Sequence, residues 1–283
     1  MGRFDGSVAV VTGAGGGLGR ASAERLAAEG ASVVGIDVNG DTAEQVAAAI
    51  GNKSIAVQAD ISSESDVQRY IDAALTAFGR IDHHHLNAGI FGTFDPLPDI
   101  SVEDFQRVMD VNVRGQFLGL RAAFRQYAQQ GSTGAIVLTA SIASITGSAD
   151  LLPYVTSKHA VSGLIRGAAM YGGPLGIRVN GVAPGIVPTA LFAAAATTPG
   201  GANDMAKRAS TTPLRRAGRA EEIAAVAAFL LSEDASYMTG QIVSADGGAN
   251  IVNTVRPSGG AGAWDYEAVD RNLYHHLKEG ADR

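Results

Sequence analysis

A glycine-rich loop near the start of the chain constrains the fold more than any other feature. An apolar run at residues 7–12 enters the loop, and an alanine-rich segment with helical spacing at 18–29 leaves it. A strand, a glycine turn and a helix form the first half of a βαβ unit that binds dinucleotides. The generic G-x-G-x-x-G pattern is not met, because the chain reads Thr-Gly-x-x-x-Gly-x-Gly from Thr12 to Gly19. An ordinary strand-to-helix turn is the alternative interpretation.

The loop suits a pyrophosphate for two physical reasons. The N-terminus of a helix offers free N–H groups and a positive dipole end to an anion. Glycine lets the backbone approach a phosphate without a Cβ in the way. The loop residues that we expect to contact the cofactor are Gly13, Gly16, Gly17, Leu18 and Gly19.

A carboxylate closes the second apolar run. Asp37 follows residues 31–36 directly, where it can accept hydrogen bonds from both hydroxyls of an adenosine ribose. The same charge repels a 2′-phosphate, and no Arg or Lys occupies positions 14–16 or 38–39 to neutralise one. We therefore expect NAD rather than NADP. The competing interpretation, that Asp37 caps the next helix, is partly met by Asp41.

A tyrosine and a lysine four positions apart indicate proton transfer. Tyr154 and Lys158 fall on one face of a helix. Free tyrosine titrates near pH ~10, and a fixed cation beside the phenol lowers that pKa, each unit being worth ~1.4 kcal/mol. The pair alone is common by chance, and a surface helix pair is the alternative. Ser141, at the end of an apolar run upstream, together with the glycine loop favours a shared site.

Strand-like and helix-like segments alternate along the chain. The alternation predicts an α/β fold, a doubly wound, parallel, seven-stranded Rossmann sheet with helices on both faces. Ligands bind such sheets beyond the carboxyl ends of the strands, and Gly13 and Ser141 both follow such ends. The expected strands are 7–12, 31–36, 54–58, 82–87, 134–140, 177–182 and 241–244. The expected helices are 18–29, 41–50, 64–78, 103–130, 154–172 and 221–231.

These residues together resemble the short-chain dehydrogenase/reductase (SDR) family over about residues 4 to 249. Further motifs in the family's order are Ala59-Asp60-Ile61, Asn87-Ala88-Gly89, Asp110-Val111-Asn112-Val113 and the run 177–185. The resemblance implies the strand order 3-2-1-4-5-6-7. Beyond the loop, it implies cofactor contacts from Asp37, Val38, Asp60, Ile61, Asn87, Ala88, Gly89, Tyr154, Lys158, Pro184, Gly185, Val187 and Thr189.

The resemblance also implies a mechanism based on Asn112, Ser141, Tyr154 and Lys158. Hydride would pass to or from the nicotinamide while Tyr154 takes or gives the hydroxyl proton. Lys158 would lower the pKa of Tyr154 and hold the nicotinamide ribose, and Ser141 would orient the substrate oxygen. Asn112 would hold a water that links Lys158 to solvent; an asparagine bonded to its own helix backbone is the alternative. Thr189 would bond the carboxamide, unless it is an ordinary loop threonine.

The fourth expected strand departs from the family, which prefers aliphatic residues where this chain has His83, His84 and His85. Three histidines suggest a metal, but strand side chains alternate between faces, so adjacent histidines cannot readily converge on one ion. The chain has no cysteine to complete a site. We therefore expect hydrogen-bonded, partly buried imidazoles and no metal. Leu86 replaces an asparagine of the family, and Tyr171 replaces a common glutamate, which argues against an ion pair between subunits there.

The substrate is the part of the function that the sequence constrains least. Its expected pocket is almost entirely apolar, which favours a compact hydrophobic ketone or secondary alcohol as the partner and permits a broad range. The leading hypothesis is an NAD-dependent secondary-alcohol dehydrogenase. A 3-oxoacyl-thioester reductase and a catalytically silent NAD-binding regulator remain the alternatives. The expected pocket wall consists of Phe94, Ile142, Ala143, Leu151, Leu152, Ile186, Leu191 and Phe192.

Length and composition agree with a single enzyme domain. The 283 residues allow one large α/β core, and Lys+Arg 22 against Asp+Glu 28, a net charge of −6, argue against a nucleic-acid surface. Without cysteine, a signal peptide or a membrane-length apolar run, a soluble cytoplasmic protein is the expectation.

We expect one NAD-binding domain at 1–249, with an irregular substrate lid at about 186–212, and a C-terminal extension at 250–283. The extension carries Trp264, Tyr266, Val269, Leu273 and Tyr274 at roughly helical spacing, and an apolar stripe of that kind must be buried somewhere. We expect it to pack over the lid of its own or a neighbouring subunit, or else to line only the oligomer surface. The family resemblance implies a homotetramer.

Overall fold

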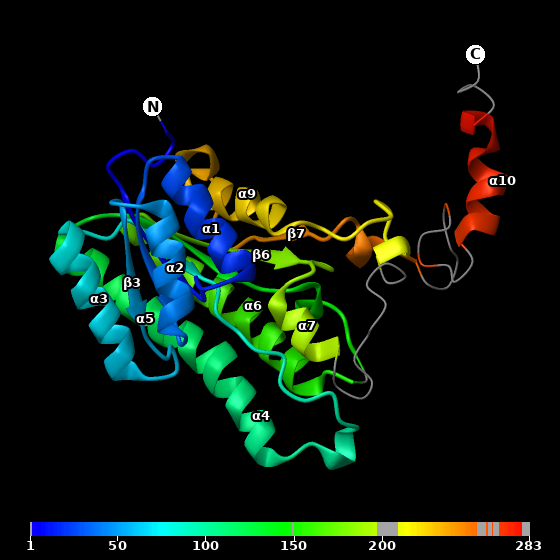
Figure 1. The fold of residues 1–283 in the computed structure, drawn as a ribbon, viewed down its shortest axis with the longest axis horizontal. Coiled ribbons are helices and arrows are strands. Elements are labelled where there is room, and N and C mark those ends of the chain that lie inside the picture. The colour runs from blue at the N-terminus through cyan, green and yellow to red at the C-terminus, as the bar shows by residue number, and fades with distance from the viewer. Residues whose placement is uncertain are drawn as a thin grey trace.

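The protein folds around one parallel sheet whose two faces are covered by helices (Figure 1). The computed structural model describes residues 2–148, 150–196, 209–253, 259, 262 and 266–278. Seven strands pair in the order β3-β2-β1-β4-β5-β6-β7, and every pairing is parallel. The predicted fold class and strand order are therefore confirmed. The strands are β1 Val8–Thr12, β2 Ser32–Asp37, β3 Ser54–Gln58, β4 His83–Leu86, β5 Gly134–Thr139, β6 Ile177–Pro184 and β7 Ile242–Ala245.

The strands form where apolar and β-branched residues run together. All five residues of β1 are buried, as expected for a strand with helices on both of its faces. On one face of the sheet α1 packs against α2 and α9, and on the other α3 and α6 pack against α5. The helices are α1 Gly17–Ala28, α2 Gly40–Ile50, α3 Glu64–Phe78, α4 Val102–Met109, α5 Gln116–Gln130, α6 Leu152–Gly172, α7 Ala190–Ala196, α9 Ala220–Leu231 and α10 Tyr266–Lys278.

Local capping sets several helix ends. The side chains of Asn39 and Ser63 accept hydrogen bonds from the backbone of the first turns of α2 and α3. Gly79 ends α3 and Gly131 ends α5 in the left-handed region, at φ 76° and 62°. These caps explain why the predicted bounds of α2, α3 and α5 agree with the structure within a residue at the capped ends.

The predicted single helix at 103–130 is interrupted. A π-helical segment, Asp110–Gly115, separates α4 from α5. The segment widens the helix where the buried side chain of Asn112 turns out of it to bond neighbouring elements. Interruptions of this kind are frequent at functional sites.

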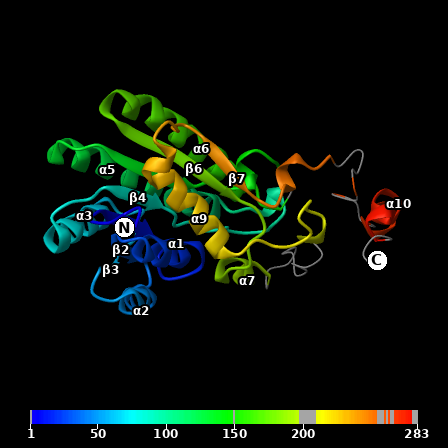
Figure 2. The same cartoon turned by 90° about the horizontal axis from the view of Figure 1, so that it is seen from above.

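The predicted lid and tail contain helices. Within 186–212, residues 190–196 form α7, whereas 197–208 lie outside the described residues. The helical spacing of the tail is confirmed by α10, which stands apart from the sheet and its helices in both views (Figures 1 and 2). Trp264 lies outside the described residues. Within the described part of the chain, no helix is long and apolar enough to span a bilayer.

Candidate active site

A cavity of about 600 Å³ opens at the carboxyl ends of β1, β4, β5 and β6. It lies at the point where the strand order reverses between β1 and β4, which is where parallel α/β sheets bind ligands. Of the predicted site residues, Gly19 and Asn112 do not line it. Those that do are Gly13, Gly16, Gly17, Leu18, Asp37, Val38, Asp60, Ile61, Asn87, Ala88, Gly89, Ser141, Tyr154, Lys158, Pro184, Gly185, Val187 and Thr189.

The glycine loop forms one end of the cavity, and its geometry fits a phosphate group. Gly13 and Gly17 adopt positive φ values of 69° and 52°, which favour glycine. No side chain caps the N-terminus of α1, so its first N–H groups are not taken by a cap. Gly19 contributes differently, because a Cβ there would lie 2.0 Å from the carbonyl oxygen of Gly13. It allows α1 to approach the loop closely.

Asp37 presents its carboxylate to the same end of the cavity. Its two oxygens accept hydrogen bonds from the backbone N–H groups of Gly15, at 2.9 Å, and Asn39, at 3.0 Å. These bonds fix the carboxylate while leaving lone pairs for two further donors, which suits a ribose diol. Gly15 has no room for a side chain, since its Cβ would lie 2.2 Å from Thr42 Oγ1.

Tyr154, Ser141 and Lys158 meet at the centre of the cavity. The Ser141 side chain lies close enough to the Tyr154 phenol to lower its pKa, and Lys158 Nζ lies 5.5 Å from the centroid of the Tyr154 ring. The Lys158 ammonium donates a hydrogen bond to the backbone oxygen of Thr139, at 2.7 Å. The structure therefore brings together the phenol, hydroxyl and amine that the sequence singled out.

The predicted lowering of the Tyr154 pKa is not found in the structure as it stands. Burial raises the pKa of the phenol to about 12, and the hydrogen bond from Ser141 opposes this only in part. Burial also lowers the pKa of Lys158 to about 8. Desolvation is the largest cause at both groups, and the Lys158 ammonium donates its hydrogen bond to the Thr139 carbonyl.

Asn112 supports the site through hydrogen bonds without lining the cavity. Its Oδ1 accepts from the Ile90 N–H at 2.8 Å, and its Nδ2 donates to the Ile90 carbonyl at 2.8 Å and to Ser157 Oγ at 3.0 Å. Ser157 in turn donates to the carbonyl oxygen of Tyr154 at 2.7 Å. The alternative in which Asn112 bonds its own helix backbone is therefore wrong. Its side chain joins the loop after β4 to the start of α6.

A polar floor underlies the cavity, formed by Thr12, Asn87, Thr139 and Lys158. Thr12 Oγ1 accepts from the backbone N–H groups of Asn87 and Ala88, at 2.9 and 3.1 Å. Asn87 Nδ2 donates to the Thr12 carbonyl at 3.1 Å, and Thr139 Oγ1 donates to Asn87 Oδ1 at 2.9 Å. The polar floor thus ties the ends of β1, β4 and β5 together by directional bonds.

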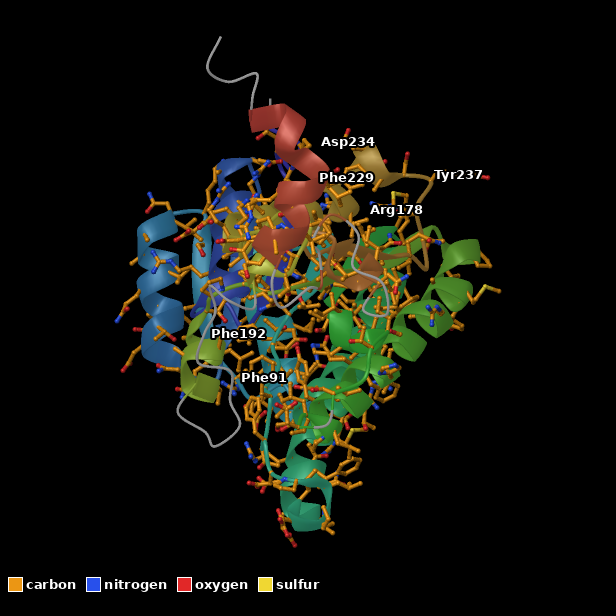
Figure 3. The ribbon with its side chains drawn as sticks, turned by 90° about the vertical axis from the view of Figure 1, so that its right-hand side faces the viewer. Phe91, Arg178, Phe192, Phe229, Asp234 and Tyr237 are labelled. Carbon is orange, nitrogen blue, oxygen red and sulfur yellow. The ribbon has the colours of Figure 1, made fainter. Side chains whose placement is uncertain are left out.

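An aromatic wall, formed by Phe91, Phe94 and Phe192, lines the cavity next to Tyr154. The ring of Phe91 makes edge contacts with Tyr154, Phe192 and Phe94, at centroid distances of 4.7, 5.1 and 6.0 Å. Figure 3 shows Phe91 and Phe192 side by side, the latter on α7. Phe91 was not predicted, because nothing in its local sequence separates it from an ordinary loop phenylalanine. Leu152, which was predicted, does not line the cavity.

The three histidines of β4 each meet a different partner. His83 stacks edge-on against Phe4 at 5.1 Å, His84 Nδ1 lies 2.9 Å from the Tyr127 hydroxyl, and His85 Nε2 lies 3.0 Å from Thr139 Oγ1. Burial lowers the pKa of His84 to about 3 and of His85 to about 4. Among the described residues, no group of three or more His, Asp or Glu side chains could hold a metal ion.

The tail touches the end of the predicted lid without lining the cavity. The backbone N–H of Gly262 donates to the Thr211 carbonyl at 2.8 Å, and Arg215 pairs with Asp270 on α10 at 3.0 Å. The Arg215 guanidinium also lies 5.1 Å from the centroid of the Tyr266 ring. No described residue beyond Phe192 lines the cavity, so the expected closure by the tail is not made within this subunit's described residues.

Sequence comparison identifies the class of protein. The profile of the family described as Enoyl-(Acyl carrier protein) reductase matches residues 13–250. Together with the parallel sheet and the arrangement of Ser141, Tyr154 and Lys158, this match establishes that the chain belongs to the short-chain dehydrogenase/reductase family.

The relatives found by sequence include alcohol and ketone enzymes. Levodione reductase of Leifsonia aquatica is 40% identical over 254 residues, which cover 87% of this chain and 95% of that protein. Cyclohexanol dehydrogenase of an Acinetobacter strain is 37% identical over 248 residues, again 87% of this chain and 95% of that protein.

Solved structures agree with these matches. The crystal structure of levodione reductase superimposes with a TM-score of 0.84 at 38% identity, covering 88% of this chain and 100% of that one. NAD⁺-bound xylitol dehydrogenase gives a TM-score of 0.80 at 36% identity, covering 87% of this chain and 99% of that one. The chain is thus an SDR oxidoreductase by sequence, fold and site.

Proposed function

We propose that the protein is an NAD-dependent oxidoreductase that interconverts a hydrophobic secondary alcohol and its ketone. The observation that carries the proposal is that Tyr154, Ser141 and Lys158 line one cavity together with a glycine loop at a helix N-terminus and an aromatic wall. Such a site can hold a dinucleotide and an apolar carbonyl compound together.

Each residue has a distinct task in this reaction. A bound nicotinamide dinucleotide would supply the hydride donor or acceptor. Tyr154 moves the proton of the substrate hydroxyl, and Ser141 holds the substrate oxygen within reach of the phenol. Lys158, cationic below a pKa of about 8, places positive charge beside the developing phenolate and can donate to ribose hydroxyls. Asn112 keeps α6, and with it Tyr154, in register with the loop after β4.

The choice of NAD over NADP rests on Asp37. Its carboxylate faces the cavity and is fixed by two backbone N–H groups, so it cannot swing away from an added phosphate without losing both bonds. The neighbouring loop position, Gly15, has no space for a basic side chain that would neutralise one. NAD⁺-bound xylitol dehydrogenase, a structural relative, supports the same choice.

The aromatic wall favours an apolar ring as substrate. Phe91, Phe94 and Phe192 present flat apolar surfaces next to Tyr154, which pack better against a saturated ring than against a polyol. A relative named for cyclohexanol supports this substrate class. The alternative of a 3-oxoacyl-thioester reductase is supported by a structural relative described as 3-ketoacyl-(acyl-carrier-protein) reductase, at 34% identity. A silent NAD-binding regulator is the weaker alternative, because the proton-transfer residues are all present.

The assembly that we propose is a homotetramer built on the outer helices and the β7 edge. Several large side chains outside the cavity are exposed, among them Met170 and Tyr171 on α6. Tyr237, before β7, is also exposed (Figure 3). Light scattering tests this directly: a stable monomer at micromolar concentration would rule the tetramer out.

A substrate panel tests the proposed function. The purified chain is mixed with NAD⁺ or NADH and with cyclic ketones and alcohols, linear polyols and 3-oxoacyl thioesters, and NADH absorbance is followed. We expect the highest kcat/KM for a six-membered cyclic ketone or alcohol. A higher value for a thioester would favour the reductase alternative, and no turnover with any substrate, despite NADH binding, would favour the regulator.

A further inference from the structure

β4 carries a histidine that reaches the floor of the active site from inside the sheet. His85 is fully buried, and its Nε2 lies 3.0 Å from Thr139 Oγ1 on the adjacent strand β5. Thr139 Oγ1 lies 2.9 Å from Asn87 Oδ1, and Asn87 lines the cavity beside the glycine loop. One chain of hydrogen bonds therefore runs from the core of the sheet to the cofactor end of the site.

The direction of each bond in this chain follows from one backbone carbonyl. The carbonyl oxygen of Thr12 can only accept, so Asn87 must turn its Nδ2 toward it. Asn87 Oδ1 then faces Thr139 and accepts the single hydroxyl proton of that threonine. Because Thr139 Oγ1 has given away its proton, it can only accept from His85, so the proton of the imidazole sits on Nε2.

His85 is held in this one state. Its Nδ1 is buried and has no hydrogen-bond partner among the described residues, so a second proton there would be a charge without compensation. The pKa of the imidazole, lowered to about 4 by burial, agrees with a neutral ring throughout the neutral pH range. The donor toward Thr139 is therefore permanent rather than pH-dependent at neutral pH.

Thr139 connects this series of hydrogen bonds to the reacting groups. Its side chain is fixed from both sides, by His85 and by Asn87, and its backbone oxygen accepts the ammonium of Lys158 at 2.7 Å. Thr139 also lines the cavity itself. A threonine that lost the bond from His85 could rotate its hydroxyl away from Asn87 and loosen the polar floor.

We propose that His85 is a positioning residue for the cofactor site, which acts by fixing the Thr139 hydroxyl and, through it, the side chain of Asn87. The inference rests on the proposed function, because it requires that a dinucleotide occupies the cavity. It assigns a task to a buried histidine that the reaction itself does not use.

The same strand supplies a matched control. His84 is the neighbouring residue and is equally buried, but strand side chains alternate, so it points to the opposite face of the sheet. There its Nδ1 bonds the hydroxyl of Tyr127, which does not line the cavity. Replacing either histidine with leucine removes one buried imidazole and one hydrogen bond, yet only His85→Leu touches the polar floor.

The test measures NADH binding by fluorescence titration, alongside thermal unfolding. We expect His85→Leu to weaken NADH binding about three- to tenfold, the effect of one lost hydrogen bond. His84→Leu should lower the unfolding temperature and leave the dissociation constant for NADH within about twofold of the wild type. His85→Gln, whose Nε2 can reach the position of the imidazole Nε2, should restore most of the binding.

Three results would overturn the proposal: unchanged NADH binding in His85→Leu, equal weakening in both leucine variants, or no recovery in His85→Gln. If His85→Leu does not fold, ¹⁵N NMR of the wild-type histidine rings decides. His85 should be the Nε2–H tautomer, and its ring shifts should change when NADH is added while those of His84 do not; the opposite tautomer or no response rejects the role. A wild-type chain that fails to bind NADH at all would instead reject the proposed function.

Discussion

The polar floor and the aromatic wall belong to one cavity but are held by different forces. In the polar floor, Thr12, Asn87 and Thr139 are joined by bonds of 2.9 to 3.1 Å, each with one donor and one acceptor. In the aromatic wall, Phe91, Phe94 and Phe192 touch only through ring edges. Directional bonds permit one arrangement, whereas apolar contacts tolerate several. The floor therefore fixes the chemistry, and the wall selects the substrate with less precision.

The substitution with the largest expected effect is Tyr154→Phe. The Tyr154 ring packs on Phe91 of the aromatic wall and lies beside Lys158 of the polar floor. Removing the hydroxyl takes away the proton donor and acceptor but keeps the ring that packs on Phe91. We expect kcat to fall about a thousandfold, while the dissociation constant for NADH stays within about twofold. Stopped-flow turnover and NADH titration measure the two quantities. A variant that keeps more than a few per cent of wild-type kcat would refute the assigned mechanism.

Lowering the pH should reduce the free energy of unfolding through the two histidines buried beneath the polar floor. The phenylalanines of the aromatic wall do not titrate. His84 and His85 have folded-state pKa values of about 3 and 4, below the ~6.5 of an unfolded histidine. The unfolded chain therefore binds more protons below pH ~6.5, and stability falls as pH drops from there toward the folded values. Each histidine should contribute roughly 1 kcal/mol per pH unit of this loss.

Urea unfolding at pH 7.5 and pH 5.5 measures that loss. His84→Phe keeps a ring of similar size without a titrating group, so it should lose less stability between the two pH values than the wild type does. Carboxylates contribute equally to both proteins and cancel in the difference. If the two proteins lose the same stability, His84 is not buried in the neutral form.

The choice between NAD and NADP tests the role of Asp37, which lies at the glycine-loop end of the cavity rather than in the polar floor. NAD should exceed NADP in kcat/KM by at least about tenfold, an order of ~1.4 kcal/mol. Asp37→Ser removes the repulsive charge and should narrow that gap, because a serine hydroxyl can still bond a ribose oxygen or an added phosphate. Initial rates with both cofactors give the ratio. Equal use of NAD and NADP by the wild-type chain would contradict the role of Asp37.

Substitutions in the aromatic wall should have smaller effects on the kinetic constants than the changes described above. Phe192→Ala removes the ring that packs on Phe91, and we expect KM for an apolar cyclic substrate to rise about fivefold with kcat nearly unchanged, since one lost edge contact is worth about 1 kcal/mol. Phe117→Ala, at an exposed position of α5 outside the cavity, serves as the control. A drop in kcat without a change in KM would mean that Phe192 supports the chemistry rather than the substrate.

The smallest expected effect belongs to the tail. Truncation after Ala249 removes the contacts that Arg215 and Thr211 make with Gly262 and Asp270. If the tail of a neighbouring subunit helps to close the wall, KM for substrate should rise about twofold with NAD affinity unchanged. Asp270→Asn, which removes only the ion pair, should give a smaller rise. A lower unfolding temperature with unchanged KM would identify the tail as structural.

The sequence predicted part of each region. Asn87 and Lys158 of the polar floor and Phe94 and Phe192 of the aromatic wall were expected, whereas Thr12, Thr139 and Phe91 were not named as site residues. The alternation of apolar runs places strand ends within a few residues; β3, for example, has the predicted bounds 54–58. The wall depends on contacts between distant segments, such as Phe91 with Phe192, that no local pattern encodes. The alternation of side chains along β4 predicted that the three histidines face different surroundings, yet it could not reveal that His85 meets Thr139.

Two other predictions differ from the structure. The alanine-rich run at 190–196 forms α7 although its composition resembled an irregular lid, because alanine has the highest helix propensity. The pKa of Tyr154 was predicted to fall because Lys158 is near in sequence, but burial depends on everything packed around the phenol. Proximity along the chain predicted which groups lie together, but not the direction in which the pKa of Tyr154 shifts.

The π-helical segment Asp110–Gly115 has a consequence for how this chain can change. A π turn holds a residue more than an α turn spanning the same rise, so deleting a single residue there would leave the length of the rod formed by α4 and α5 almost intact. Because each kind of turn completes one revolution, the residues before the deletion would also keep their rotation around the axis relative to α5. The widened segment from which Asn112 bonds Ile90 and Ser157 would be lost. Such a deletion would leave the outline of the helix unchanged and still remove its link to the start of α6.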